Sequence, residues 1–320
     1  MKIGLVGLGR MGGAMAQRLT SQGHDVVAWD RRAEAVQAAG NSCRAAENPR
    51  EVAEASEAVL STITEDGGVR RIFTGPGGFL EGDVAGKLFI EMSTLQPMTI
   101  RALVPLVEAK GARLVDSPVL GTIPSVRDGR LVALMGGREE DVERAKQVLA
   151  PLTRRVVHMG PSGSGSVMKL AANLGMGAYL QAVAEALALG DSYGLSVPLM
   201  LDVLMEGAFA SPWLKAKTEV FSGGKTDISL DVKTIRKDLM SAVATGAAAG
   251  VPMPLTSGAL ASLSAADTRA RSAILSANVP MPQNRSATRF AAPTWSSTSR
   301  ASVASPSAVA CKNAPGGNGT

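Results

Sequence analysis

The chain has 320 residues, of which 45% are apolar, and it carries a formal net charge of +5. This length and apolar content suit a soluble protein of two globular domains, and the 3% share of aromatic residues predicts cores built mainly from aliphatic side chains. Two cysteines and two histidines exclude a disulfide framework and a multi-histidine metal site. We therefore expect no bound metal and a reducing, cytoplasmic setting.

The basic excess lies entirely at the C-terminal end. Residues 267–320 carry six Lys or Arg and one Asp, whereas residues 1–266 carry equal numbers of acidic and basic side chains. A balanced body lacks the basic surface that nucleic-acid binding requires. No apolar run is long enough to span a bilayer, and three glycines and Arg10 make the N-terminal run a poor signal peptide. We therefore expect neither nucleic acid nor a membrane as a partner.

Short apolar runs alternate with helical patterns along the first half. The runs predicted to be strands are 2–7, 25–30, 57–63, 86–93, 112–118, 129–137 and 154–160. They are continuously apolar, as strands of a parallel sheet buried on both faces are. The segments predicted to be amphipathic helices are 11–22, 33–40, 66–73, 97–110 and 138–151. This succession predicts an α/β fold, a Rossmann-type doubly wound sheet, for residues 1–161.

The pattern changes at residue 162. Residues 162–264 have no strand signal and predict an all-helical domain for substrate binding and dimerisation. Its expected helices cover 166–192, which connects the two domains, and then 197–206, 212–221, 230–249 and 254–263. Residues 265–320 lack any period and are crowded with Ser, Ala, Pro and Gly. We expect this tail to be disordered and to contain no final helix.

A glycine-rich turn follows the first predicted strand. In "GLGRMG", Gly7, Gly9 and Gly12 have the G-x-G-x-x-G spacing, and a helical pattern follows. The first glycine allows a tight turn, the second lets the backbone approach a pyrophosphate, and the third allows close packing of helix and strand. Free N–H groups at the helix start favour a phosphate. The sequence thus predicts a dinucleotide site rather than a purely structural turn.

The choice between NAD and NADP depends on the end of the second predicted strand. A carboxylate there, in this chain Asp30, accepts hydrogen bonds from the ribose hydroxyls of NAD and repels the 2′-phosphate of NADP. Arg31 and Arg32 follow directly. Their planar guanidinium groups are able to bind that phosphate instead, or they are simply solvated at a turn. We favour NAD and leave NADP open.

Six motifs in order make the chain, from residue 1 to about 260, similar to the β-hydroxyacid dehydrogenases, the family of 3-hydroxyisobutyrate dehydrogenase, tartronate semialdehyde reductase and 6-phosphogluconate dehydrogenase. The motifs are "GLGRMG" (7–12), "EMSTLQP" (91–97), "DSPVLGT" (116–122), "MGGREEDVERAKQVL" (135–149), "GPSGSGSVMKLAAN" (160–173) and "RKDL" (236–239). The glycine turn is shared with many enzymes, whereas the lysine motif and the order of all six are more specific. The resemblance implies an NAD(P)-dependent oxidoreductase, acting on a CH–OH group, in a homodimer or homotetramer.

The resemblance also implies roles for individual residues. Lys169 is the expected acid–base group, and Asn173 is expected to contact the substrate. Thr94, which follows Ser93, should lie near the nicotinamide. The residues expected to bind the dinucleotide are Gly7, Leu8, Gly9, Arg10, Met11, Gly12, Asp30, Arg31, Ile63, Thr64, Thr94 and Lys237. Those expected to bind the substrate are Gly121, Thr122, Lys169 and Asn173.

Two motifs depart from the family pattern. The substrate loop usually reads D-x-P-V-S-G-G, but here Leu120 replaces the serine and Thr122 replaces a glycine. Either the substrate differs from the common small 3-hydroxy acids, or Thr122 takes over part of the anchoring. In the lysine motif, Ala172 stands where an asparagine is common, while Asn173 is retained.

The spacing of Lys169 and Asn173 suits acid–base chemistry. Residues four apart lie about 40° apart around a helix axis, so the two side chains share a face. Reduction of a carbonyl needs a proton on the oxygen, and a partly desolvated lysine, whose pKa falls, is able to donate and recover it. The alternative is a lysine that extends from a helix end to solvent. The motif context favours catalysis.

We therefore predict an enzyme that interconverts a β-hydroxyacid and its semialdehyde or ketone by hydride transfer. Two alternatives stay open. The first is a related activity on a sugar acid, by oxidative decarboxylation, or on an imine. The second is a non-catalytic dinucleotide-binding protein. Two features support this alternative: the missing serine at position 120 and the unusual C-terminal segment.

Overall fold

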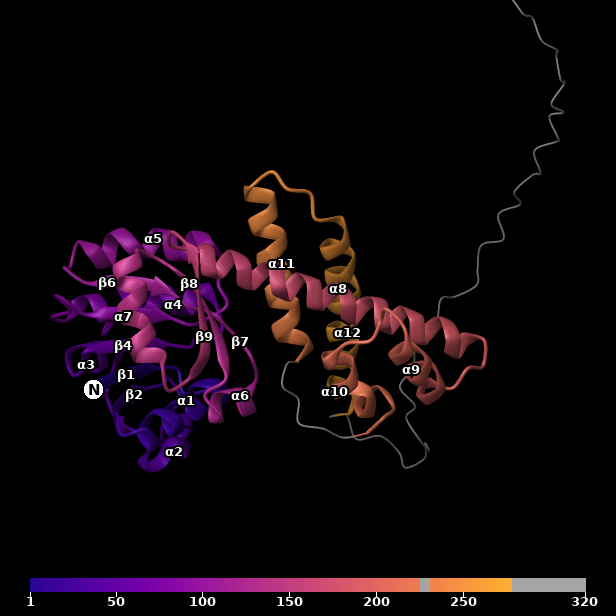
Figure 1. The fold of residues 1–320 in the computed structure, drawn as a ribbon, viewed down its shortest axis with the longest axis horizontal. Coiled ribbons are helices and arrows are strands. Elements are labelled where there is room, and N and C mark those ends of the chain that lie inside the picture. Colours follow the sequence, from indigo (N-terminus) through magenta and orange to yellow (C-terminus); the bar gives the residue numbers. More distant parts are fainter. Residues whose placement is uncertain (225–230, 278–320) are drawn as a thin grey trace, which may run out of the picture. The chain divides into compact units, whose positions relative to one another are not determined.

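A single sheet organises the N-terminal half of the computed structural model, which describes residues 1–224 and 231–277 (Figure 1). Its strands are β1 (Lys2–Val6), β2 (Asp25–Trp29), β3 (Arg44–Ala45), β4 (Ala58–Ser61), β5 (Leu88–Glu91), β6 (Arg113–Asp116), β7 (Val119–Leu120), β8 (Leu131–Gly136) and β9 (Thr153–Gly160). The order across the sheet is β3-β2-β1-β4-β5-β6-β8-β7, with β9 paired to β8. From β3 to β6 every neighbouring pair is parallel.

Helices cover both faces of this sheet. They are α1 (Arg10–Ser21), α2 (Ala33–Ala39), α3 (Pro49–Glu54), α4 (Asp66–Thr74), α5 (Pro97–Glu108), α6 (Ile123–Arg127) and α7 (Glu139–Leu149), with 3₁₀ turns at Gly40–Ser42 and Phe79–Glu81. One buried cluster joins the strands to α1, α2, α6 and α7, and a second joins them to α3, α4 and α5. Adjacent strand residues such as Val59 and Leu60 belong to opposite clusters. The predicted doubly wound Rossmann-type fold is confirmed.

The sheet is not parallel throughout. Strand β8 pairs antiparallel with β6 and with β7, whereas β9 is parallel to β8. The link from β6 to β8 holds only β7 and the short helix α6, and antiparallel strands need no full crossover helix between them. The elements that the sequence did not predict are β3, β7, α3 and α6. They span two to six residues, which is too short for a periodic pattern to be read.

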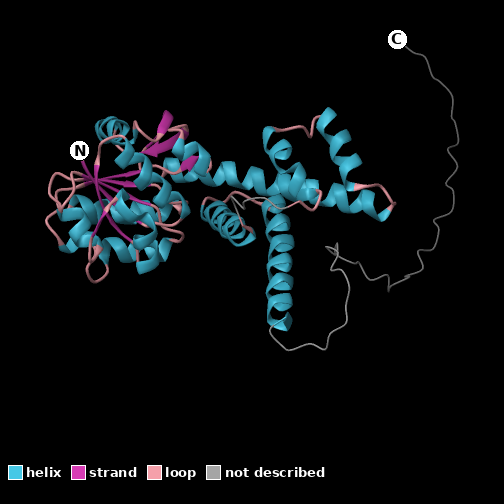
Figure 2. Cartoon of the chain, turned by 90° about the horizontal axis from the view of Figure 1, so that it is seen from below, coloured by secondary structure: helices cyan, strands magenta, loops and turns pink. Residues whose placement is uncertain are grey.

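Every regular element described after Gly160 is a helix (Figure 2). These helices are α8 (Ser164–Ser192), α9 (Val197–Glu206), α10 (Pro212–Phe221), α11 (Val232–Ala248) and α12 (Pro254–Ala277). One apolar cluster joins α8 to α9 and α10, and another joins α8 to α11 and α12. The long helix α8 therefore carries both small cores. The helical C-terminal part is confirmed, while the domain boundary after residue 161 stays a prediction.

The last helix corrects one expectation. α12 continues to Ala277, so residues 265–277 are helical, although we expected disorder from residue 265 and no final helix. The run 265–277 contains neither proline nor glycine, so nothing in it stops a helix that has already formed. The remainder of the expected tail, 278–320, lies outside the described residues. None of the helices that are described is long and apolar enough to cross a bilayer.

An aromatic cluster on one face of the sheet provides a test of the fold. Phe73, Phe79 and Phe89 are buried, and their ring centroids lie 4.9 to 5.3 Å apart. Because Phe→Ala removes this packing and leaves a cavity, Phe89→Ala should lower the free energy of unfolding by about 3–5 kcal/mol. The control Met98→Ala removes a side chain that is 57% exposed and should change it by less than about 0.5 kcal/mol. Urea unfolding measures both, and equal effects would contradict the assignment.

Candidate functional site

The glycine turn between β1 and α1 leaves room for a ligand against its backbone. A Cβ atom on Gly7, whose φ is +96°, would lie 2.4 Å from the carbonyl oxygen of Thr62. One on Gly12 would lie 1.8 Å from the carbonyl oxygen of Gly7. Both positions therefore require glycine. At Gly9, by contrast, a Cβ atom would have no described atom within 4 Å, so the backbone is open there.

The start of α1 lies beside this open backbone. Arg10 and Met11 form the first turn of α1, and Gly9 precedes it. The first N–H groups of a helix lack partners within the helix and carry partial positive charge. An open glycine backbone followed by such a helix start is the arrangement that binds a pyrophosphate. The residues present thus fit a dinucleotide.

Asp30 at the end of β2 is bound to the glycine turn. Its carboxylate accepts hydrogen bonds from the N–H of Leu8 (2.8 Å), from the N–H of Arg32 (2.9 Å) and from Nε of Arg32 (3.2 Å). Burial alone would raise the pKa of Asp30, but the hydrogen bonds from Arg32 and Leu8 outweigh it and hold the pKa below its usual value. Asp30 is therefore ionised at neutral pH. Arg31 and Arg32 are both exposed, and Arg32 forms an ion pair with Asp30.

The loops after β4 and β5 meet beside the glycine turn. The hydroxyl of Thr62 donates to the carbonyl oxygen of Gly7 (2.8 Å), and the N–H of Ile63 donates to Oγ of Ser93 (2.6 Å). Thr64 is exposed and Thr94 is half-buried. The structure thus brings Ile63, Thr64 and Thr94, which were predicted to bind the cofactor, to the same edge of the sheet as the glycine turn.

Two buried carboxyl groups beneath these loops were not predicted as site residues. Glu91 ends β5 and Asp116 ends β6, where they are paired in register, and both are fully buried. Burial raises the pKa of Glu91 to about 7, hydrogen bonds from Ser61 and Ser93 oppose the rise, and the charge of Asp116 adds to it. Both residues lie in motifs quoted above, "EMSTLQP" and "DSPVLGT". A charged residue ending an otherwise apolar strand is the signal that would have identified them.

Asp116 attaches helix α8 to the sheet. Its carboxylate accepts hydrogen bonds from the N–H of Gly163 (2.7 Å) and the N–H of Ser166 (2.8 Å), at the start of α8. A Cβ atom at Gly165 would lie 2.1 Å from the carbonyl oxygen of Leu134, so the helix start touches β8. Burial raises the pKa of Asp116, and the two backbone N–H groups oppose that rise.

Asn173 and Lys237 belong to one polar network between α8, α11 and the loop after β5. Nδ2 of Asn173 donates to Oδ2 of the buried Asp238 (2.6 Å), and Nζ of Lys237 pairs with Oδ1 of Asp238 (2.8 Å). Lys237 also donates to the carbonyl oxygen of Thr94 (2.7 Å). Asp238 was missed as an individual residue, although the "RKDL" motif contains it.

Lys169 lies one turn before Asn173 on α8, and its side chain interacts electrostatically with this network. Burial lowers the pKa of Lys169, the negative charge of Asp238 opposes that shift, and the positive charge of Lys237 adds to it. The structure therefore joins two of the predicted residues, Asn173 and Lys237, directly to Asp238, and the charges of Asp238 and Lys237 act on Lys169. A lysine with a lowered pKa releases its proton more readily than one in water.

Gly121 and Thr122 lie on the loop between β7 and α6 and are exposed. Gly121 has a φ of +139°, and a Cβ atom there would lie 2.7 Å from the side chain of Leu131. Thr122 is the residue that precedes α6, and its N–H donates to Oγ of Ser125 (3.3 Å). Neither residue joins the hydrogen bonds around Asp238 among the described residues, so their expected role in substrate binding stays a prediction.

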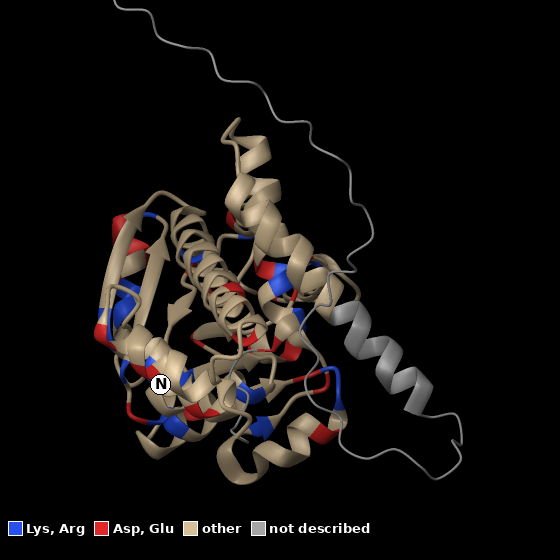
Figure 3. Cartoon of the chain, turned by 90° about the vertical axis from the view of Figure 1, so that its right-hand side faces the viewer, with Lys and Arg blue, Asp and Glu red and all other residues tan. Residues whose placement is uncertain are grey.

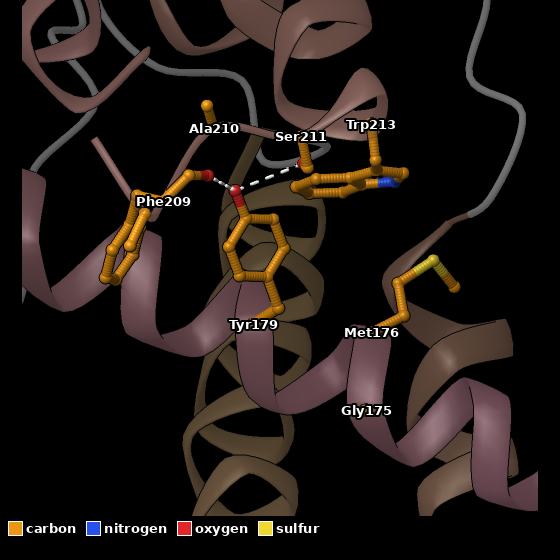
Figure 4. A pocket seen from close by; sticks show the side chains of 8 residues that line it. Gly175, Met176, Tyr179, Phe209, Ala210, Ser211 and Trp213 are labelled. Atoms are coloured by element: carbon orange, nitrogen blue, oxygen red, sulfur yellow. Dashed lines mark hydrogen bonds between the residues drawn. The ribbon is translucent and has the colours of Figure 1, made fainter. Parts of the chain in front are cut away.

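A cavity of about 390 Å³ lies farther along α8 (Figure 4). Its lining residues are Gly175, Met176, Tyr179, Ala208, Phe209, Ala210, Ser211 and Trp213. The hydroxyl of Tyr179 donates to the carbonyl oxygen of Phe209 and accepts from Ser211 (3.2 Å). The lining contains no charged residue and none of the predicted site residues, so this cavity lacks the groups that acid–base chemistry needs.

Acidic and basic residues are interspersed along the described elements (Figure 3). The pKa of Asp231, which precedes α11, is lowered mainly by hydrogen bonds from Thr234. The positive charges of Lys233 and of the exposed Arg10 make smaller contributions to this lowering. Groups of three or more His, Cys, Asp or Glu that could hold a metal ion are absent among the described residues. That the protein binds neither metal nor nucleic acid stays a prediction.

Family models match both halves of the chain. Residues 2–160 match the NAD binding domain of 6-phosphogluconate dehydrogenase. Residues 163–287 match the model described as NAD-binding of NADP-dependent 3-hydroxyisobutyrate dehydrogenase.

Relatives with known names are 30–32% identical to the chain over the aligned residues. The 2-(hydroxymethyl)glutarate dehydrogenase of Eubacterium barkeri is 32% identical, over 80% of this chain and 86% of the relative. The glyoxylate/succinic semialdehyde reductase 1 of Arabidopsis thaliana is 31% identical, over 81% and 90%. The cytokine-like nuclear factor N-PAC of Mus musculus is 30% identical over 81% of this chain, which spans only 46% of that longer protein.

Solved structures have the same fold. A 3-hydroxyisobutyrate dehydrogenase from Salmonella typhimurium is similar with a TM-score of 0.75 and 26% identity, over 84% of this chain and 95% of that one. The 3-hydroxyisobutyrate dehydrogenase of Mycobacterium tuberculosis, solved with L-serine, gives 0.73 and 27%, over 82% and 92%. The chain belongs to the 3-hydroxyisobutyrate dehydrogenase-like family of NAD(P)-dependent β-hydroxyacid dehydrogenases, whose dinucleotide-binding domain is that of 6-phosphogluconate dehydrogenase.

Proposed function

We propose that this protein interconverts a β-hydroxyacid and the corresponding semialdehyde or ketone, with Lys169 as the general acid and base. The observation that carries the proposal is the position of Lys169. Its amine has a lowered pKa, and the neighbouring Lys237 is hydrogen-bonded to the loop that holds Thr94. An acid–base group beside the cofactor loops is what reduction of a carbonyl requires.

The chain's own residues would bind the substrate and move a proton. The nicotinamide, when bound, supplies or accepts the hydride. In reduction, the ammonium of Lys169 donates a proton to the carbonyl oxygen as negative charge develops there, and in oxidation the neutral amine removes the proton from the hydroxyl. Asp238 fixes the amide of Asn173, which leaves the amide oxygen to accept a hydrogen bond from the substrate hydroxyl.

We propose NAD as the preferred cofactor. The carboxylate of Asp30 is ionised, and it is held at the end of β2 by Leu8 and Arg32. A fixed negative charge there disfavours a 2′-phosphate and accepts the ribose hydroxyls of NAD. The pairing of Arg32 with Asp30 supports this choice, because it directs one of the two arginines away from the role of phosphate ligand.

A non-catalytic role is the second candidate, because the cytokine-like nuclear factor N-PAC is about as similar to this chain as the enzymes are. The enzyme is favoured, because Lys169 is retained one helical turn before Asn173, and Asn173 belongs to a polar network that reaches the cofactor loop at Thr94. We further propose a homodimer or homotetramer that acts on a small hydroxyacid in the cytoplasm.

Replacing Lys169 tests its role. Lys169→Ala should lower kcat by at least about a thousandfold, because the group that transfers the proton is lost. The Kd for NADH should stay within about threefold of the wild-type value. Lys169→Arg should be similarly inactive, since a guanidinium keeps the charge but does not release a proton. The control Lys110→Ala removes an exposed lysine and should be fully active. Wild-type turnover by Lys169→Ala would refute the assignment.

The pH profile provides an independent test. In the direction of reduction Lys169 must be protonated, so kcat/KM should fall as the pH rises through its pKa. Burial lowers that pKa from the ordinary 10.5, so the fall should begin well below pH 10.5. In the direction of oxidation the neutral amine is required, and the rate should rise over the same range. Proton transfer by Lys169 would be contradicted if the rate of reduction did not fall, and the rate of oxidation did not rise, over this pH range.

Cofactor choice depends on the charge of Asp30. Asp30→Asn keeps an acceptor for the N–H of Leu8 but removes the negative charge. The Kd for NADPH divided by the Kd for NADH should therefore fall by about tenfold, which corresponds to about 1.4 kcal/mol in favour of NADPH. Fluorescence titration of both cofactors measures the ratio. An unchanged ratio, or a wild-type protein that prefers NADPH, would contradict the choice of NAD.

A further inference from the structure

Three polar residues occupy the last paired row of the sheet beneath the cofactor loops. Ser61 on β4 is paired in register with Glu91 on β5, which is paired with Asp116 on β6. All three side chains are buried. Asp116 holds the start of α8, but the reaction proposed above assigns nothing to Glu91. A fully buried carboxyl group costs folding free energy unless hydrogen bonds compensate it, so its partners indicate what it does.

The partners of Glu91 all lead to the loops after β4 and β5. Oε2 accepts a hydrogen bond from the hydroxyl of Ser61 (2.5 Å), and Oε1 accepts one from the N–H of Ser93 (2.9 Å). The hydroxyl oxygen of Ser93 in turn accepts a hydrogen bond from the N–H of Ile63 (2.6 Å), and this hydroxyl also opposes the rise in the pKa of Glu91. Ser93 is thereby bound from both sides. One carboxyl group thus fixes the main chain at Ile63 and at Ser93 together.

The two loops held in this way contact the glycine turn and the helical part of the chain. Thr62 donates its hydroxyl to the carbonyl oxygen of Gly7 (2.8 Å). The residue after Ser93 is Thr94, whose carbonyl oxygen accepts from Lys237 (2.7 Å). Any change in the position of these loops therefore moves Ile63, Thr64 and Thr94, the residues on them that are expected to bind the cofactor.

We propose that Glu91 is a positioning residue for the bound dinucleotide, acting through Ser93 on the loops 62–64 and 92–95. This inference rests on the proposed dinucleotide-dependent reaction, and it adds a residue that touches neither cofactor nor substrate. Its predicted effect is on cofactor affinity rather than on the proton-transfer step. A buried N–H group that loses its hydrogen-bond acceptor lowers the stability of the folded protein. We expect the loop to move until this N–H group finds another acceptor.

Substitutions at Glu91 separate positioning from bulk stability. Glu91→Leu keeps the size but removes both acceptors, so the Kd for NADH should rise by about tenfold or more, and KM for the cofactor should rise more than kcat falls. Glu91→Gln keeps the shape and an acceptor oxygen, and its amide is able to bond to Ser61, so the Kd should stay within about twofold. Fluorescence titration of NADH measures the Kd without any substrate.

Ser93→Ala gives a second route if Glu91→Leu fails to fold, and it should weaken NADH binding by about tenfold. Its matched control is Ser56→Ala, which also removes a buried serine hydroxyl, one that donates to the carbonyl oxygen of Val52 (2.6 Å) away from the cofactor loops. Ser56→Ala should bind NADH like the wild type, even if its Tm falls equally.

Wild-type affinity for NADH in Glu91→Leu or in Ser93→Ala would overturn the inference, and so would an equal loss of affinity in Ser56→Ala. Failure of the proposed reaction gives a different result. In that case the wild-type protein binds NADH but oxidises no hydroxyacid, and the NADH affinities of the variants still decide the role of Glu91.

Discussion

The pair of hydrogen bonds from the start of α8 to Asp116 is the interaction on which the site depends. Asp116 is buried at the end of β6, and α8 begins where its carboxylate accepts the N–H groups of Gly163 and Ser166. Because a helix is stiff, fixing its first turn fixes the direction of Lys169 and Asn173, one and two turns later. The same helix carries both apolar clusters of the C-terminal part. The carboxylate at the end of β6 therefore helps to set the position of Lys169, the acid–base group proposed for catalysis.

Polar contacts connect this helix with the cofactor loops in a continuous series. Asn173 binds Asp238, Asp238 pairs with Lys237, and Lys237 donates to the carbonyl oxygen of Thr94. Glu91 holds the residue before Thr94. Buried polar groups in such a network are costly to leave unpaired, so each contact restricts the others. This series explains how residues more than a hundred positions apart in the sequence form one site.

The sequence predicted the longer helices and strands, which have a regular pattern of apolar residues, and the glycine turn, which has a fixed spacing. The helices α9 and α10 have the predicted bounds, because Pro198 and Pro212 mark their first turns. The glycine turn could be predicted because close backbone approach at Gly7 and Gly12 excludes every other residue type. The partners of Asp238, Glu91 and Asp116 could not be predicted, since their contacts join strands and helices that are distant in the chain. The extension of α12 to Ala277 was missed because composition was given more weight than the absence of a helix-stopping residue.

The central claim is that this protein catalyses hydride transfer between the nicotinamide and the carbon of a carbonyl group. It is tested most directly by following an isotope. Two samples of NADH are prepared, each deuterated at C4 of the nicotinamide on one of its two faces. Each sample is incubated with the wild-type protein and a panel of semialdehydes and keto acids. The products are analysed by mass spectrometry. The account predicts a hydroxyacid with one deuterium on the carbinol carbon, from one of the two faces only. Bound cofactor without any deuterated hydroxyacid across the panel, with NADPH tested in parallel, would contradict it.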